Sequence, residues 1–161
     1  MAREHLSRRT RQPGHDQSFR TSEKFHVAAG LVLPDHYRIE DHPRDIDDIY
    51  GDYGVVPEAV IRNTENGRLL YVEVKKQGPS GNAEERAYKH YAPAFIRLIH
   101  ERTGLDYHPF ATVFCEHIAV DARYTEKIGR SLDYPHYFLW ENYRLDLIEE
   151  WLEDVRATWL D

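Results

Sequence analysis

The clearest pattern of apolar and polar positions lies in two neighbouring segments, VVPEAVIRN and RLLYVEVKK, which the dipeptide Asn66-Gly67 separates. Both segments are rich in valine, isoleucine and leucine and short enough to be strands. Asn-Gly is a strong signal for a two-residue hairpin turn, because both residues tolerate positive φ. We therefore predict a β-hairpin in which Glu65 pairs with Arg68 across the turn.

Further elements flank this hairpin. The apolar residues 25–33 lead into an acidic, loop-rich stretch, and the final residues 145–160 have the apolar spacing of an amphipathic helix. Pro93 marks a kink or break within the helical segment 82–104, which ends at Gly104. The intervening chain predicts a helix over NAEERAYKHYAPAFIRLIHERTG, strands over PFATVFCEHIAV and HYFLWEN, and a short helix at TEKIGR. The sum is an α/β fold, a small mixed β-sheet flanked by helices.

Length and composition define the class of protein. A chain of 161 residues with 41% hydrophobic residues is expected to form one globular domain. Its N-terminal part is basic and aperiodic, so we predict a mobile arm over residues 1–24 and a folded domain over residues 25–161. Nonspecific contact with DNA is the alternative role of that arm.

The chain shows no sign of export or of a membrane anchor. Its apolar runs are far shorter than the ~20 residues that cross a bilayer, and no apolar segment follows the basic N-terminus. The single cysteine, Cys115, has no intrachain partner for a disulfide, which is typical of the reducing cytoplasm. We therefore expect a cytoplasmic protein without membrane contacts.

Charge is unevenly distributed along the chain. The formal net charge of -7 argues against a general nucleic-acid-binding protein, which is usually basic. Residues 35–58 and 141–161 are predominantly acidic, whereas basic residues outnumber acidic ones in 62–102. A polyanion is therefore expected to bind through this middle third.

The predicted hairpin gathers charged side chains on one face. With the register set by the turn, Glu58 lies opposite Lys75, and Glu73 lies diagonally across from Glu58. Since side chains alternate between faces, Glu58, Glu73 and Lys75 project together, whereas Val72 and Val74 point into the core. A cross-strand Glu–Lys pair is also an ordinary surface contact. The proline before Glu58 and the residues after Lys75 favour a functional interpretation.

These residues carry a family resemblance. Pro57-Glu58 and Glu73-Val74-Lys75 resemble the motif of the PD-(D/E)xK nucleases, with glutamate where the first acid is usually aspartate. The following GNAEERAYK, residues 81–89, resembles the Gly-Asn-Ala-x-Glu-Arg element of the EcoRI/MunI-like type II restriction endonucleases, with the MunI branch nearest. The resemblance extends from about residue 30 to the C-terminus. It implies a restriction-endonuclease-like core and a homodimeric, Mg²⁺-dependent enzyme that cuts double-stranded DNA.

The resemblance also implies roles for the catalytic residues. Glu58 and Glu73 would bind Mg²⁺ through their carboxylates, and Val74 would add its backbone carbonyl oxygen. Carboxylates, water and substrate oxygens are the usual magnesium ligands, and such a metal activates water and offsets phosphoryl charge. Lys75 would hold the attacking water and stabilise developing negative charge.

The Gly-Asn-Ala element would read the bases from a helix N-terminus that begins after Gly81. Asn82 suits bidentate contact with adenine, Ala83 suits the thymine methyl group, and Arg86 donates to a purine N7. Glu85 would orient Arg86. A local structural role is compatible with this one, because Asn82 is a good N-cap and Glu85 completes an arrangement like a capping box.

The remaining expectations concern the substrate. Lys76 and Lys89 are candidates for phosphate contacts. The resemblance implies a palindrome centred on AATT that is cut to leave 5′ overhangs, with CAATTG favoured over GAATTC and bare AATT. Two alternatives stay open. One is a sequence-specific DNA-binding protein with weakened catalysis, which Glu58 and the acidic balance suggest, and the other is a repair or junction nuclease on the same fold.

Overall fold

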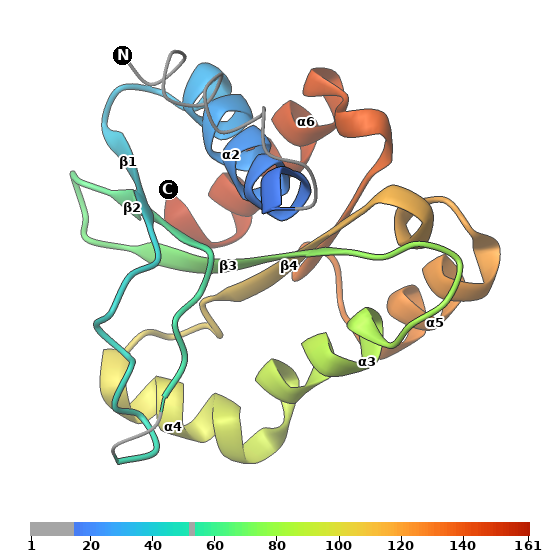
Figure 1. Cartoon of the computed structure of the whole chain (residues 1–161). Helices are drawn as coiled ribbons and strands as arrows, with labels where there is room; N and C mark the ends of the chain where they lie inside the picture. The colour runs from blue at the N-terminus through green and yellow to red at the C-terminus, as the bar shows by residue number, and fades with distance from the viewer. Residues whose placement is uncertain (1–14, 52–53) are drawn as a thin grey trace.

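The computed structural model describes residues 15–51 and 54–161 (Figure 1). The first described element is helix α2, His15–Val32, which packs Phe25, Ala28 and Ala29 into the core. Helix α2 runs through the predicted boundary at residue 24, and Thr21 on its N-terminal side is buried. The rest of the predicted arm, residues 1–14, lies outside the described residues.

The centre of the fold is a five-stranded mixed sheet in the order β1-β2-β3-β4-β5. Strands β1 to β3 are antiparallel, and β3, β4 and β5 run parallel to one another. The prediction of a small mixed sheet flanked by helices is confirmed, although β1 was not foreseen within the acidic stretch. The strands are β1 (Tyr37–Asp41), β2 (Ala59–Asn63), β3 (Leu69–Lys76), β4 (Phe110–Cys115) and β5 (Tyr137–Trp140).

The long helical segment after β3 is broken as predicted. Helix α4 has Pro93 in its first turn, and its C-cap Gly104 adopts a left-handed φ of 69° that glycine tolerates. The helical elements after β3 are α3 (Ala83–Ala87), η1 (Tyr88–Tyr91), α4 (Pro93–Thr103), η2 (Glu116–Ala119), α5 (Ala122–Ser131), η3 (Glu141–Tyr143), α6 (Leu145–Val155) and the final turn η4 (Arg156–Leu160).

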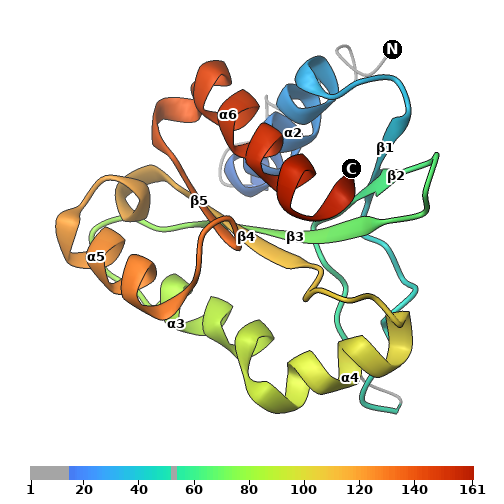
Figure 2. The ribbon, with the colours of Figure 1, turned by 180° about the vertical axis from the view of Figure 1, so that it is seen from behind.

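Helices cover both faces of the sheet. Figures 1 and 2 show α2 and α6 on one side of the sheet and α3 and α4 on the other. The first side buries Ile61, Val72 and Val74, and the second buries Val60 and Tyr71. Two buried faces explain why β3 and β4 read as almost continuous apolar runs. The predicted burial of Val72 and Val74 is confirmed.

The hairpin between β2 and β3 differs from the prediction in its turn. Asn63 pairs with Arg68 across a loop of residues 64–67, in which Gly67 has a positive φ of 78°. The Asn63 side chain accepts a hydrogen bond from the Glu65 backbone N–H, and the Asn66 side chain accepts one from Arg68. These asparagine bonds stabilise the longer turn, so the two-residue turn is wrong.

The longer turn changes the strand register without exchanging the faces. Ala59 pairs with Val72 and Arg62 with Leu69, a shift of two residues from the predicted pairing. A shift of two keeps every side chain on its predicted face. Continued by one residue beyond β2, the observed register places Glu58 opposite Glu73 instead of Lys75.

Candidate active site

Glu73 and Lys75 form the centre of the candidate site on the central strand β3. The Lys75 ammonium lies 3.3 Å from Glu73 Oε2, so the predicted association of these two residues is confirmed. Glu73 is 6% exposed and follows the buried Tyr71 on the face that α4 covers. The strand therefore carries a carboxylate into the wall of the core, while its lysine emerges toward solvent.

The surroundings of Glu73 disfavour its negative charge. Burial raises the pKa of this carboxyl, the positive charge of Lys75 lowers it, and the negative charge of Glu58 raises it again. The pKa is raised on balance, so Lys75 does not fully offset the loss of hydration and the repulsion from Glu58. A cation bound here would remove that cost.

Glu58 lies near this pair but directs its carboxylate elsewhere. Its Oε2 accepts a hydrogen bond of 2.9 Å from the Ser22 hydroxyl of α2 and lies 3.5 Å from His42 Nε2. The predicted position opposite Lys75 is wrong, because the turn shifts the register. Glu58 nevertheless contributes to the field at Glu73, as the raised pKa of Glu73 shows.

The donor atoms suit a hard divalent cation. Among residues 15–51 and 54–161, no cluster of three or more histidine, cysteine, aspartate or glutamate side chains is arranged to hold a metal. Magnesium is commonly held by one or two carboxylates together with water and substrate oxygens. The excess negative charge of Glu58 and Glu73 fits such an ion. Val74 is buried on the opposite face, which leaves only its backbone as a contributor.

Two predicted phosphate-binding lysines lie in different surroundings. Lys89 is exposed on η1, and its charge lowers the pKa of Glu73, so it belongs to the surroundings of the candidate site. Lys76 is the last residue of β3 and lines a pocket together with Lys24 of α2. The structure therefore brings Lys89, but not Lys76, to the side of Glu73.

The start of α3 is held by a residue that sequence analysis did not select. The Asn82 side chain makes no capping hydrogen bond, so the predicted capping role is wrong. Instead, the Ala83 backbone N–H donates to Gln77 Oε1 at 2.5 Å. Gly81 has a φ of 134°, and an added Cβ would lie 3.0 Å from the Gln77 side chain. Gln77 thus connects the end of β3 to the start of α3.

The exposure of the Gly-Asn-Ala element separates its residues into two groups. Asn82, Glu85 and Arg86 are exposed, whereas Ala83 is 2% exposed in an apolar cluster. The Ala83 methyl group is buried in this structure, and its contact with thymine stays a prediction. The Glu85 carboxylate lies 3.8 Å from the Lys127 ammonium, and its orienting role toward Arg86 also stays a prediction.

Several site residues were missed for identifiable reasons. Ser22 and His42 belong to segments that were interpreted as an arm and a loop, and only the fold brings them to Glu58. Lys127 reaches the buried Glu84 at 3.0 Å from α5. Gln77 had a usable signal, because a glutamine two residues after Lys75 stands at the end of a buried strand.

The sequence of the chain matches that of a known family. Residues 51–158 match the family described as Type II restriction enzyme MunI. The chain is 32% identical over 127 residues to the type II restriction enzyme MunI of Mycoplasma sp, an alignment covering 70% of this chain. It spans 63% of that relative's length.

The fold agrees with this sequence match. The crystal structure of MunI restriction endonuclease in complex with cognate DNA superposes with a TM-score of 0.69 and 22% sequence identity. The superposition covers 86% of this chain and 89% of the other, which confirms the predicted fold class. No helix within the described residues has the length and apolar character needed to span a membrane.

Proposed function

Because the chain belongs to the family of the type II restriction enzyme MunI, we propose that it is a Mg²⁺-dependent endonuclease that cuts double-stranded DNA at a specific sequence. The observation that carries this proposal is the contact between the buried Glu73 and Lys75, with Glu58 beside them. A buried carboxylate with an unfavourable charge is costly to a fold, and such groups are common where catalysis needs them.

The two carboxylates have a defined task in this proposal. Glu58, Glu73 and the Val74 carbonyl oxygen would hold the Mg²⁺ ion, which supplies positive charge at the phosphate and lowers the pKa of water. Glu58 must then give up at least part of its contacts with Ser22 and His42. The Ser22 hydroxyl positions the Glu58 carboxylate until that exchange takes place.

Lys75 acts on the attacking water and the phosphate. Its ammonium has three N–H donors, and Glu73 is its one ion-pair partner within the described part of the chain. The remaining donors are free to orient the water and to stabilise charge that develops on the phosphoryl oxygens. Lys89, exposed on η1, would hold a neighbouring phosphate.

Sequence recognition is assigned to the exposed residues at the start of α3. Asn82 suits a bidentate contact with adenine, and Arg86 donates to a purine N7. We propose a palindrome with an AATT centre, CAATTG first, cut before the AATT to leave 5′ overhangs. Each subunit would read one half-site, so the enzyme would act as a homodimer with two-fold symmetry. A cytoplasmic location is in keeping with the free, buried Cys115.

Digestion of a random-sequence DNA library with Mg²⁺ tests the proposal. We expect discrete cleavage, with AATT at every mapped end and no cleavage by the Lys75→Ala variant. Ends without AATT would refute the specificity while leaving the nuclease intact. A gel shift on specific DNA without any cut would favour the DNA-binding alternative, to which the engaged Glu58 carboxylate lends support.

A further inference from the structure

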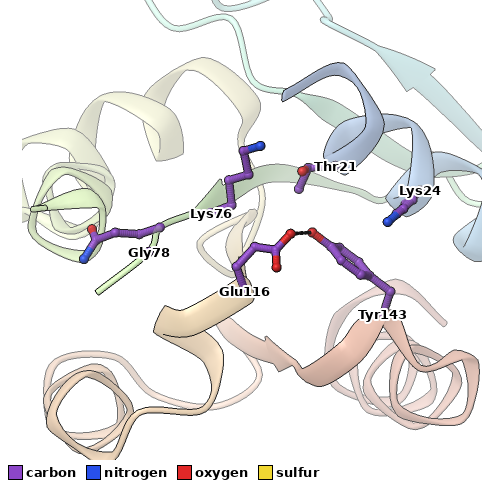
Figure 3. Close-up of a pocket in the computed structure, with 7 residues that line it drawn as sticks. Thr21, Lys24, Lys76, Gly78, Glu116 and Tyr143 are labelled. Atoms are coloured by element: carbon purple, nitrogen blue, oxygen red, sulfur yellow. Dashed lines mark hydrogen bonds between the residues drawn. The ribbon is translucent and has the colours of Figure 1, made fainter. Parts of the chain in front are cut away.

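A polar pocket lies at the end of β3, around Lys76. It encloses about 370 Å³, whereas one water occupies about 30 Å³ in the liquid, so a hydrated phosphate group fits. Figure 3 shows side chains from several elements around this space. The lining residues are Thr21, Lys24, Lys76, Gln77, Gly78, Glu116 and Tyr143.

The pocket forms where the parallel strands end. Lys76 is the last residue of β3, Glu116 follows β4, and Tyr143 lies shortly after β5. Ligands of α/β sheets commonly bind outside the carboxyl ends of such strands. Helix α2 closes the pocket with Thr21 and Lys24, three residues apart on the same side of the helix.

Positive charge exceeds negative charge among the lining side chains. Lys24 and Lys76 face one carboxylate, Glu116, and all three influence the pKa of the nearby Cys115 thiol. Glu116 accepts a hydrogen bond of 2.6 Å from the Tyr143 hydroxyl, and Lys24 Nζ lies 3.9 Å from the centre of the Tyr143 ring. Lys76 has no ion pair with any residue the structure describes. The pocket therefore has an unneutralised cation to offer an anion.

Two lining residues adopt costly backbone conformations. Glu116 has a φ of 65° and Tyr143 a φ of 54°, in the left-handed region that glycine prefers. Non-glycine residues in this region are strained, and they gather at ligand sites. Here they place Glu116 and Tyr143 against each other across the pocket, as the dashed line in Figure 3 marks.

We propose that this pocket binds a backbone phosphate of the DNA through Lys24 and Lys76. The inference rests on the proposed function and assigns a contact on the sheet face opposite Glu73 and Lys75. Helix α2 links the two sites, because Ser22 bonds to Glu58 while Lys24 lines the pocket. A phosphate held here fixes the position of the DNA strand relative to the catalytic carboxylate. Glu116 weakens this contact by repulsion.

The salt dependence of DNA binding tests the pocket. Each phosphate contact contributes about -0.9 to the slope of log K against log salt. Lys24→Gln and Lys76→Gln should each make the slope shallower by about 0.9 per subunit on a duplex of arbitrary sequence. For the proposed homodimer the slope changes by about 1.8 in total, so the loss of DNA affinity in each variant should shrink about twelvefold between about 50 and about 200 mM salt. Arg130→Gln, at an exposed position on α5 outside the basic segment 62–102, is the control and should leave the slope unchanged.

Two further variants separate phosphate binding from a general charge effect. Glu116→Gln retains an acceptor for the Tyr143 hydroxyl and should tighten binding. Tyr143→Phe should leave the slope unchanged, because the hydroxyl donates to Glu116 and, being neutral, releases no counterion. If Lys24→Gln and Arg130→Gln change the slope equally, or Glu116→Gln weakens binding, the pocket assignment is wrong. Wild-type protein that binds no DNA at all would instead refute the proposed function.

Discussion

Glu73→Gln is the substitution that best separates catalysis from folding. It removes a negative charge from a position that is 6% exposed, where burial and Glu58 raise the carboxyl pKa despite Lys75. Glutamine keeps the size of the side chain and one acceptor oxygen for Lys75. We expect DNA cleavage to be lost and the folded state without metal to become more stable at neutral pH.

The size of this stabilisation follows from linkage. A glutamate whose folded pKa exceeds its ordinary value of 4.5 loses stability as pH rises from 4.5 through the folded pKa. A difference of one between the folded and unfolded pKa values corresponds to about 1.4 kcal/mol. For a chain of this size about 1 kcal/mol moves Tm by about 2–4 °C. The free energy of unfolding of the variant should therefore equal that of wild type in acid. At neutral pH it should be higher, by the amount that wild type loses when Glu73 ionises.

Thermal unfolding in EDTA across the pH range, with the Glu73 pKa measured by NMR, provides the test. The Tm difference between the proteins should open between pH 4.5 and the measured pKa and stay constant above it. Adding Mg²⁺ should raise the Tm of wild type and leave that of the variant nearly unchanged. A variant less stable than wild type at neutral pH would mean that the Lys75 contact outweighs burial and repulsion, and would refute the reasoning.

Three other changes give distinct readouts. Glu58→Asp should retain cleavage and Glu58→Ala should lose it, as measured by single-turnover kinetics, and equal rates would place the ligand elsewhere. Asn82→Ala should lose roughly 1–3 kcal/mol of cognate binding per half-site with little change on nonspecific DNA, whereas Lys89→Ala should weaken binding to all sequences alike in gel shifts. Gln77→Leu removes the acceptor for the Ala83 N–H. It should reduce the preference for cognate over altered sites with little change in Tm. An unchanged preference would contradict a link between Gln77 and sequence recognition.

The sequence predicted the fold where local pattern and tertiary packing agree. The apolar runs of β3 and β4, the break at Pro93 and the end of α4 at Gly104 all follow from local chemistry. Strand β1 was missed because the acidic stretch lacks an apolar run. It is a strand because it pairs with β2, and that pairing is a tertiary contact that the local sequence does not predict. The same is true of helix α2, which packs Phe25, Ala28 and Ala29 into the core.

The hairpin shows which part of a site a sequence determines. Alternation along a strand fixes the face of each side chain, so Glu73 and Lys75 were placed together correctly. The register depends on the turn, and Asn66-Gly67 was only part of a longer one. The Asn66 amide donates to the Leu160 carbonyl at 2.8 Å. No local pattern predicts that contact, because it joins residues 94 positions apart.

Gln77 connects the strand that carries Glu73 and Lys75 to the Gly-Asn-Ala element at the start of α3. In the proposed function, catalysis uses the charges of β3 and recognition uses the exposed start of α3, which follows β3 after a short link. Gln77 lies between them with its oxygen bonded to Ala83, while its own amide nitrogen is buried without a partner in the described structure. Through its bond to Ala83, Gln77 fixes the start of α3, and with it Asn82, relative to the strand that carries Lys75.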